Sequence, residues 1–369
     1  MAQHTGPQHD DATAGRSGLR VAVVGASGNV GTGILRALRA DPAVDHVLGL
    51  SRRAPRGEPY DGVAWHTVDV AVPDGGPVVA DLTRAFAGYD AVVHLVWAIQ
   101  PNTRRDVVRR TNVEGTRRVL EAAAAAGVAQ VVVASSIATY SPSPGPAPRD
   151  ETWGAVGVRT SHYAVDKTAQ NRLLAEFEAD HPGTAVARMR TSIVVQRDAG
   201  AEVSRLFVGP FAPLRALLAR PLPLLPLPRG LRIQLTHADD IGAAYAAVVR
   251  AGASGAFNVA AAPVLTARDL ADLLGSGRLA ELRPPLVRAA VALGWRSRLV
   301  ASDPGWLDMA MAAPIMDTTR IRALGWVPRW SAQEALLDVV AGMRDRTGTQ
   351  SPALRPDDRL LDDVDLRKP

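Results

Sequence analysis

The 369-residue chain contains no cysteine, which excludes a disulfide framework, a thiolate nucleophile and a thiolate metal site. We predict no metal site of another kind, and the absence of cysteine fits a reducing, cytoplasmic setting. The chain also has no uninterrupted apolar run of about 18 residues, so we expect no membrane span. Residues 1–18 are polar and Gly-rich and lack the apolar centre of a secretory signal.

Lysine is nearly absent too, because all but two of the 42 basic residues are arginines. The net charge is +5, but the arginines are dispersed and acidic residues accompany them. Surfaces that bind nucleic acid concentrate basic residues instead, so we expect no nucleic-acid partner. The two lysines are Lys167 and Lys368. In a chain with so few lysines, the presence of Lys167 four residues after Tyr163 needs an explanation.

Continuous runs of apolar, β-branched residues alternate with helical patterns in the first half of the chain. Such runs are typical of parallel strands that are buried on both faces. The clearest runs span 19–25, 46–51, 90–97 and 130–136. Helical stretches separate them, and the longest covers 103–127 and ends at a glycine. This alternation predicts an α/β fold with a doubly wound, Rossmann-type parallel sheet.

The composition changes near residue 200, where residues 208–230 alternate leucine with proline and cannot form one regular helix. We predict a Rossmann domain over 19–195 and a smaller C-terminal α/β substrate-binding lobe over 196–347, with 236–262 returning to the Rossmann core. Residues 1–18 and 348–369 are predicted to be disordered tails.

A glycine-rich loop follows the first predicted strand and opens a helix. The segment GASGNVG places Gly25, Gly28 and Gly31 in a G-x-x-G-x-x-G pattern. Glycines allow a tight turn and the close approach of a pyrophosphate, and the free N–H groups of the helix N-terminus bind the anion. We therefore predict a dinucleotide site. Its expected loop contacts are Gly25, Ser27, Gly28, Asn29, Val30 and Gly31.

The end of the second predicted strand indicates which dinucleotide binds. About 20 residues after the last glycine of the loop, an NAD site usually has a carboxylate for the ribose 2′-hydroxyl. This chain has Ser51, Arg52 and Arg53 there, and two guanidinium groups suit a 2′-phosphate. We predict NADP as the preferred cofactor, with NAD as the alternative if the arginines stack on adenine or face water. Asp69, followed by Val70, either accepts from the adenine amino group or caps a turn.

Tyr163 and Lys167 are spaced i, i+4, which places both side chains on one face of a helix. Tyrosine is a poor acid–base group at neutral pH, but a nearby ammonium lowers its pKa. Lysine is a compact charge that can also donate to ribose hydroxyls, which arginine does less well. We therefore predict that Lys167 lowers the pKa of Tyr163. Ser136 lies at the end of a predicted strand, where its hydroxyl could bond a substrate oxygen.

These motifs together resemble the extended short-chain dehydrogenase/reductase family, in its NAD(P)-dependent epimerase/dehydratase group. The segments that carry the resemblance lie between residues 19 and 345: GASGNVG, AVVHL, TNVEGTRRVLEAA, SSIATY, YAVDK, THADDIGAAY and LGWVPRWS. The resemblance implies that Ser136 and Tyr163 are catalytic and that Lys167 holds the nicotinamide ribose. It implies that Asn112 positions the lysine and a water molecule, unless this asparagine only kinks its helix.

The resemblance also suggests further contacts. Leu95, Val96 and Trp97 follow a strand next to the expected nicotinamide site, and His94 and His237 are expected to be structural. Candidate substrate contacts are Trp97, Ser136, Ile137, Ser192 and Phe207. The Leu/Pro-rich segment could form an apolar lid with Phe207, Phe211 and Leu217, or it could be a packed or disordered insertion. A homodimer would pair through the helices that contain Asn112 and Tyr163.

Two departures weaken a sugar-nucleotide function. Ile233 stands where the sugar-nucleotide enzymes of the family carry arginine, and Ile137 and Ala138 stand where dehydratases carry Asp-Glu. Our leading hypothesis is therefore an oxidoreductase that transfers hydride between nicotinamide and a carbonyl or alcohol carbon of a small molecule. The alternatives are an epimerase or dehydratase of a sugar or sugar nucleotide that retains its cofactor, and a non-catalytic NADP-sensing regulator.

Overall fold

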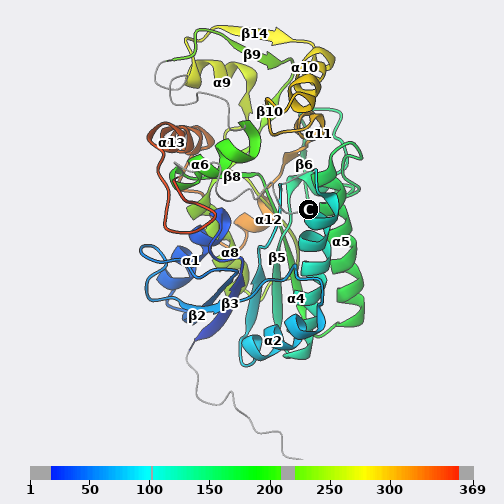
Figure 1. The fold of residues 1–369 in the computed structure, drawn as a ribbon, viewed down its shortest axis with the longest axis vertical. Helices are drawn as coiled ribbons and strands as arrows, with labels where there is room; N and C mark the ends of the chain where they lie inside the picture. The colour runs from blue at the N-terminus through cyan, green and yellow to red at the C-terminus, as the bar shows by residue number, and fades with distance from the viewer. Residues whose placement is uncertain (1–17, 101–102, 209–220, 357–369) are drawn as a thin grey trace, which may run out of the picture.

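The computed structural model describes residues 18–100, 103–208 and 221–356, leaving out the side chain of Val208. Within these ranges the chain forms a parallel sheet flanked by helices, with a smaller lobe above one end of the sheet (Figure 1). The predicted tail over 1–17, the lid residues Phe211 and Leu217, and the end of the chain from 357 lie outside the described residues.

A seven-stranded sheet organises the larger part of the fold, and all of its strands are parallel. Its order is β12-β7-β5-β4-β1-β2-β3. The strands are β1 (Leu19–Val24), β2 (Val44–Ser51), β3 (Ala64–Thr67), β4 (Ala91–His94), β5 (Gln130–Ala134), β7 (Ala185–Thr191) and β12 (Gly255–Val259). The α/β fold class and the Rossmann-type sheet predicted from the apolar runs are confirmed.

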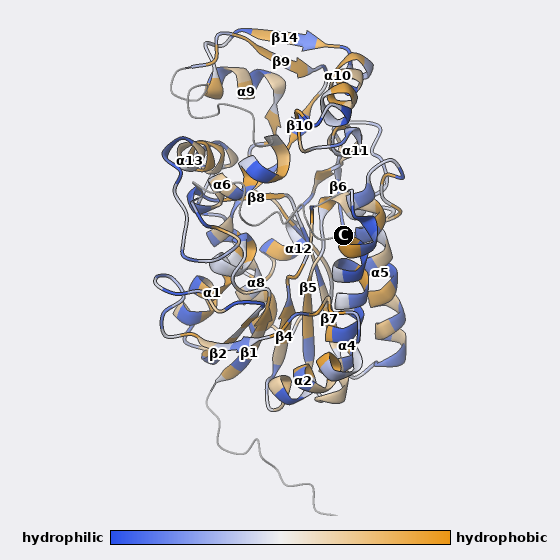
Figure 2. Cartoon of the chain, in the orientation of Figure 1, coloured by the Kyte–Doolittle hydropathy of each residue, from blue (hydrophilic) through white to orange (hydrophobic). Residues whose placement is uncertain are grey.

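Helices cover both faces of this sheet, which explains why its central strands are apolar on both sides. One face carries α1 (Asn29–Ala40) and α8 (Ala238–Arg250), and the other carries α2 (Gly76–Phe86), α4 (Gly115–Ala125) and α5 (His162–Asp180). Figure 2 shows apolar colour along the strands and alternating colour on the helices. Glycines bring α1 and α8 into backbone contact, because a Cβ on Gly33 would lie 2.1 Å from the carbonyl oxygen of Ala238.

The long helix predicted over 103–127 is interrupted by a π-helical turn. It consists of α3 (Arg105–Arg109), the π-helical segment η1 (Arg110–Glu114) and α4. A π-helical turn inserts one extra residue into the helix and is often found at functional sites. Here it contains Asn112, which is 1% exposed and points its amide toward the loop after β4.

The smaller lobe has its own apolar core, which includes Leu225, Leu270 and Leu336. It contains two two-stranded sheets, β9 (Leu225–Pro228) with β14 (Leu279–Leu282) and β10 (Arg232–Ile233) with β13 (Leu265–Thr266). Its helices are α9 (Ala267–Leu274), α10 (Pro284–Arg296), α11 (Pro304–Ala312) and α13 (Ala332–Asp345). Among the helices in the described ranges, none combines the length and apolar character that crossing a bilayer requires.

The chain passes between the two lobes several times. Strand β8 (Ile193–Val195) pairs with β11 (Leu235–His237), and β6 (Pro148–Arg149) pairs with β15 (Ile315–Met316). After β11 the chain enters α8 and then β12, which is the end strand of the main sheet. The short segments η3 (Arg197–Ala199), α6 (Gly200–Val203), η4 (Ser204–Val208) and α12 (Thr319–Arg322) complete the connections.

Disorder was predicted from residue 348 onward, and for residues 348–356 this is wrong. Ser351 and Leu354 have no exposed surface, and the hydroxyl of Ser351 donates a hydrogen bond to the carbonyl of Ser27. The composition of the tail suggested that it could bury too little apolar surface to fold. A few buried contacts nevertheless fix these nine residues against the start of α1.

Candidate active site

The predicted phosphate loop connects β1 to α1, and its geometry requires glycine. Gly25 has φ +91°, a left-handed conformation that favours glycine, and a Cβ there would lie 3.0 Å from the backbone nitrogen of Val96. A Cβ on Gly31 would lie 2.5 Å from the carbonyl oxygen of Ala26. The first N–H groups of α1 have no partner within the helix. A loop this tight in front of such a helix fits the pyrophosphate of a dinucleotide.

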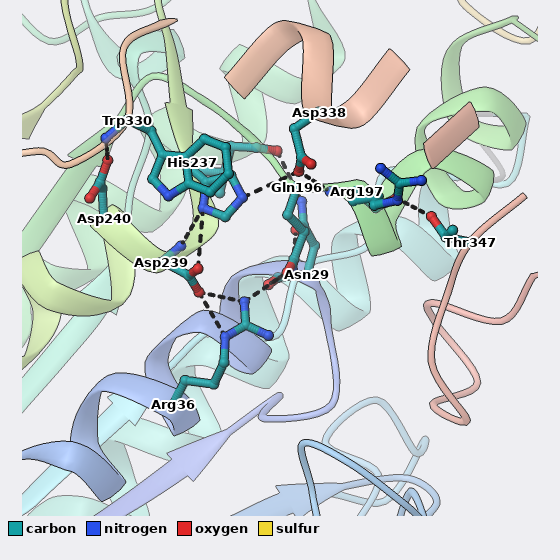
Figure 3. Close-up of polar contacts among 11 residues, drawn as sticks. Asn29, Arg36, Gln196, Arg197, His237, Asp239, Asp240, Trp330, Asp338 and Thr347 are labelled. Carbon is teal, nitrogen blue, oxygen red and sulfur yellow. Dashed lines mark hydrogen bonds and ion pairs between the residues drawn. The ribbon is translucent and has the colours of Figure 1, made fainter. Parts of the chain in front are cut away.

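The side chain of Asn29 belongs to the scaffold of this loop. Its Nδ2 donates to the carbonyl of Val194 at 2.9 Å, and its Oδ1 accepts from Gln196 at 2.9 Å. Arg36, further along α1, donates to Gln196 and to Asp239 (Figure 3). The backbone carbonyl of Asn29 also accepts from Gln196, at 2.8 Å, so only the backbone N–H of Asn29 is left for the cofactor contact that we predicted.

The residues predicted to read the ribose lie at the carboxyl end of β2. The hydroxyl of Ser51 donates to the carbonyl of Arg53 at 2.8 Å and thereby shapes the turn. The side chains of Arg52 and Arg53 are exposed. Oδ1 of Asp69 accepts the N–H of Ala71 at 2.9 Å, which is the turn-capping role left open by the sequence. Val70 is 3% exposed and packs in the core.

The amide of Asn112 holds the loop that follows β4. Its Oδ1 accepts the N–H of Ala98 at 2.7 Å, and its Nδ2 donates to the carbonyl of the same residue at 2.9 Å. This pair of bonds fixes the backbone next to Trp97, which follows the half-buried Leu95 and Val96. We predicted that Asn112 positions Lys167. In the structure its amide instead bonds to the backbone of Ala98, and its Nδ2 also donates to the carboxylate of Asp166 at 3.5 Å.

Ser136, Tyr163 and Lys167 meet at the carboxyl edge of the sheet. Ser136 caps the 3-10 helix η2 (Ile137–Thr139) directly after β5, where its hydroxyl accepts the N–H of Ala138 at 3.1 Å and is close enough to Tyr163 to oppose the rise in the pKa of the phenol. Tyr163 lies in the first turn of α5, where Ser161 caps the helix. Lys167, one turn later, is 2% exposed and donates to the carbonyl of Ala134 at 2.6 Å. The structure thus brings together the three groups that the sequence had associated.

Our prediction that Lys167 lowers the pKa of Tyr163 is wrong for this structure. Burial raises the pKa of Tyr163 above its usual value, and the nearby side chain of Ser136 opposes this only in part. Burial also lowers the pKa of Lys167 well below its usual range, against the attraction of Asp166. The ammonium lies 3.4 Å from the ring centre of Trp97 but 6.0 Å from that of Tyr163. The lysine is therefore turned toward the indole and the end of β5.

Four aromatic side chains form what we call the aromatic wall: Trp97, Tyr163, Phe207 and Trp306. The ring of Tyr163 lies 5.8 Å from that of Trp97 and 5.0 Å from that of Trp306. The ring of Phe207 meets Trp306 edge-on at 4.9 Å. The indole nitrogens of both tryptophans are buried without a hydrogen-bond partner within the described part of the chain. Two indole N–H groups therefore belong to the rings that contact the ring of Tyr163.

Trp306 was not singled out from the sequence. It lies near the start of α11, where Asp303 caps the helix and also forms an ion pair with His162 at 2.8 Å. Gln100 donates to the carbonyls of Leu206 and Ala301 and so joins the loop after β4 to the smaller lobe. These contacts close the lobe over the start of α5.

Two of the predicted substrate contacts occupy different positions. Ser192 is 4% exposed, and its hydroxyl shares a hydrogen bond of 2.7 Å with Thr236, which gives it a structural role. Ile137 is half-buried and packs with Tyr140 and Trp153 in a small apolar cluster. Phe207 and Trp97, in contrast, are part of the aromatic wall.

The two histidines have structural surroundings. His94 has no exposed surface and shares a hydrogen bond with Thr116, while burial, assisted by the charge of Lys167, lowers its pKa to about 3. It is therefore neutral at physiological pH. His237 stacks on Trp330 with ring centres 4.1 Å apart, and Figure 3 shows it between the carboxylates of Asp239 and Asp338.

Known proteins resemble parts of this chain in sequence. An uncharacterized protein of Mycobacterium tuberculosis is 28% identical over 337 residues, which cover 89% of this chain and 31% of that protein. The chain thus spans about a third of the length of this relative. The L-arabinose 1-dehydrogenase (NAD(P)(+)) of Haloferax volcanii is 34% identical over 189 residues, which cover 48% of this chain and 68% of the enzyme.

Solved structures share the fold at lower identity. The UDP-glucose 4-epimerase of Thermus thermophilus, in complex with NAD, superposes with a TM-score of 0.63 and 20% identity, covering 88% of this chain and 99% of the epimerase. The family model described as the NAD dependent epimerase/dehydratase family matches residues 21–260. This match includes the phosphate loop, the end of β5 and the start of α5. The chain therefore belongs to the NAD-dependent epimerase/dehydratase family.

Proposed function

We propose that this protein is an oxidoreductase that transfers hydride between a nicotinamide cofactor and the carbon of a carbonyl or secondary alcohol. The observation that supports this most strongly is that Ser136, directly after β5, and Tyr163, in the first turn of α5, meet at the carboxyl edge of the sheet, where Ser136 opposes the rise in the pKa of the phenol. The nicotinamide supplies or accepts the hydride. The protein must supply a proton for the substrate oxygen and a donor that orients it.

Tyr163 is the proton-transfer group in this proposal, and Ser136 orients the substrate oxygen. Because burial raises the pKa of Tyr163, the phenol keeps its proton at neutral pH. A protonated phenol is suited to give its proton to the oxygen of a carbonyl that is being reduced. Lys167 lies one turn further along α5 and can donate to hydroxyl groups of a bound ribose. The protonated phenol therefore has the form that carbonyl reduction requires.

NADP(H) is the cofactor that this proposal favours. Ser51 and two arginines stand at the end of β2 in place of the carboxylate of an NAD site, so none of these three side chains repels a 2′-phosphate. Both guanidinium groups are exposed and can pair with one. NAD(H) remains the alternative, because its 2′-hydroxyl could bond to Ser51.

We propose a sugar-like substrate that is not attached to a nucleotide. The Haloferax volcanii relative, at 34% identity, is named for the dehydrogenation of a free sugar. Flat aromatic rings such as those of Trp97 and Trp306 bury the apolar C–H face of a sugar ring. Their unpartnered indole N–H groups could donate to its hydroxyl oxygens.

An epimerase or dehydratase that retains its cofactor is the second candidate, since the family name and the solved structures favour it. The presence of Ile233 in place of the family's diphosphate-binding arginine argues against a sugar nucleotide. A non-catalytic NADP sensor is less consistent with a site that keeps both Tyr163 and Lys167.

We also propose a homodimer that pairs through the helices containing Asn112 and Tyr163. Size-exclusion chromatography with light scattering measures the mass of the protein and tests this proposal.

Cofactor choice and net redox chemistry can be tested in sequence. Thermal-shift titrations with NADPH and NADH compare the two cofactors, and greater stabilisation by NADH would contradict the NADP preference. Absorbance at 340 nm is then followed with free sugars, their lactones and keto-derivatives, and UDP-sugars. Consumption of one NADPH per product supports an oxidoreductase. Conversion of a sugar without a net absorbance change would establish an epimerase or dehydratase instead.

A further inference from the structure

Residues 348–356, which we call the C-terminal arm, run from α13 to the phosphate loop. The chain leaves α13 at Arg346, which takes a left-handed conformation with φ +53°, two residues before the arm. The hydroxyl of Thr347 then donates to the carbonyl of Arg197 at 3.0 Å (Figure 3). In Figure 1 the reddish segment that follows α13 passes down to α1.

Side-chain hydrogen bonds attach the arm to the start of α1. The buried hydroxyl of Ser351 donates to the carbonyl of Ser27, a phosphate-loop residue 324 positions earlier in the chain. The hydroxyl of Thr349 shares a hydrogen bond of 2.9 Å with that of Tyr60, which in turn bonds to Thr32 of α1 at 3.0 Å. The arm is therefore tied to the loop that would hold the pyrophosphate.

A second attachment comes from the smaller lobe and fixes the end of the arm. The guanidinium of Arg205, in η4, donates to the carbonyl of Ala353 at 2.9 Å and to that of Arg355 at 3.3 Å. Between these two residues Leu354 is completely buried. The backbone on both sides of Arg355 is thus held in place, which limits where its exposed side chain can reach.

The arm and the loop after β2 enclose a cavity of about 750 Å³. Arg53 and Arg56 line it from the loop, and Arg355 and Gln350 line it from the arm. Among the residues that the structure describes, Glu58 is the only carboxylate on the lining. Three guanidinium groups around one cavity favour an anion, and their forked donors match a phosphate.

We propose that the C-terminal arm completes the site for the adenosine 2′-phosphate of NADP(H), and that Arg355 is a specificity-determining residue in it. The inference rests on the proposed NADP preference and adds to it a residue from the opposite end of the chain. Arg53 lies in the turn that Ser51 shapes at the end of β2, where the ribose is expected. A 2′-phosphate carries a charge of about −1.5 to −2 at neutral pH, which three arginines can neutralise.

The test uses fragments of the cofactor, so that it does not depend on activity. Binding of 2′,5′-ADP and of 5′-AMP to the full chain is measured by calorimetry for the parent, Arg355→Ala and Arg355→Glu. We expect Arg355→Ala to weaken 2′,5′-ADP binding at least about tenfold, because a charge-assisted hydrogen bond is lost. Binding of 5′-AMP is expected to change by less than about twofold, and Arg355→Glu is expected to weaken 2′,5′-ADP further. Arg296→Ala removes an exposed arginine of α10 and serves as the matched control.

The possible outcomes test the role of the arm separately from the NADP preference on which it rests. If the parent prefers 2′,5′-ADP and Arg355→Ala binds it as tightly as the parent, the NADP preference stands and the role of the arm is refuted. If the parent binds both nucleotides equally, the NADP preference fails, and the proposed site fails with it. If Arg355→Ala weakens both nucleotides alike, the arm is only a general support of the adenosine site, and its specificity role is refuted.

Discussion

The ammonium of Lys167 donates a 2.6 Å hydrogen bond to the carbonyl of Ala134, the last residue of β5. Ser136 follows two residues later, so this bond holds the strand end that carries the candidate catalytic hydroxyl. The same ammonium lies over the ring of Trp97. Lysine thus connects α5, β5 and the loop after β4 through one small charged group. A guanidinium group is wider and needs more space than this 2%-exposed position provides.

Replacing this lysine should separate activity from stability. Lys167→Met keeps the length of the side chain and removes the charge whose burial lowers the pKa of Lys167. We expect turnover to fall by about 10²- to 10⁴-fold, with only a small change in melting temperature, because the lost hydrogen bond and the relieved burial of charge offset one another. Lys167→Arg should lower both the turnover and the melting temperature. Steady-state kinetics and calorimetry test this, and a methionine variant as active as the parent would contradict it.

Tyr163→Phe should reduce turnover without loss of cofactor binding. Removal of this one hydroxyl, which lies near Ser136, should change the free energy of unfolding by no more than about 1.5 kcal/mol. Loss of the proton donor should lower kcat by about 10²- to 10⁴-fold. Tyr140→Phe is the matched control, because the hydroxyl of Tyr140 donates to Asn258 in the core at 2.6 Å. Equal activity in the two variants would argue against Tyr163 as the proton-transfer group.

Glu202 should make the protein less stable as the pH rises toward neutrality. Burial raises the pKa of Glu202 from 4.5 to about 7, with Arg205 opposing the shift. The folded state therefore holds a proton that the unfolded state releases, so stability falls between about pH 4.5 and 7 and levels off above. Glu202→Gln should be more stable than the parent at pH 8 by roughly 2–3 kcal/mol, and similar to it near pH 4.5. Urea unfolding at both pH values measures the difference.

The control for this experiment is Glu121→Gln, which changes an exposed glutamate on α4. It should shift the two unfolding free energies equally, because surface substitutions usually have small effects. A Glu202→Gln variant with the same pH dependence as the parent would show that the carboxyl group is ionised in the folded protein across this range.

The contact between α1 and α8 should not tolerate a methyl group. Gly33→Ala would place Cβ 2.1 Å from a backbone oxygen of Ala238, so the helices would have to separate. We expect a loss of about 1–3 kcal/mol in the free energy of unfolding, as for other overpacked contacts. Gly183→Ala serves as the control, since a Cβ there meets no atom within 4 Å. Chemical denaturation of both variants tests the prediction, and equal stabilities would refute it.

The parts of the fold that the sequence predicted best are those with strong local physical constraints. The strands of the main sheet are apolar on both faces because helices cover both, and the phosphate loop needs glycine at Gly25 for its positive φ. The spacing of Tyr163 and Lys167 places both on one side of α5. The π-helical turn at Asn112 was not predicted, because an extra residue in a helix hardly alters a pattern of this length.

The features that were missed depend on contacts between distant segments. Trp306 reaches Tyr163 only because the smaller lobe folds back over α5, and an isolated tryptophan near the start of a helix predicts core packing just as well. The expected effect of Lys167 on Tyr163 failed because burial raises the pKa of the phenol, while the ammonium lies over the ring of Trp97, in the loop after β4. The C-terminal arm has the composition of a disordered tail, and only its partners on the phosphate loop and η4 determine its path.

The end strand of the main sheet has a consequence for synthesis of the chain. β12 pairs with β7, but it begins only at Gly255. It is therefore synthesised after the connecting segments that contain η4 and β9. Until then the backbone of β7 offers open hydrogen-bonding groups to any neighbouring nascent chain. A fragment that ends at residue 195 lacks β12, so β7 would remain an unpaired edge strand that other chains can bind. A fragment that ends after Ala260 contains β12 and could cover this edge.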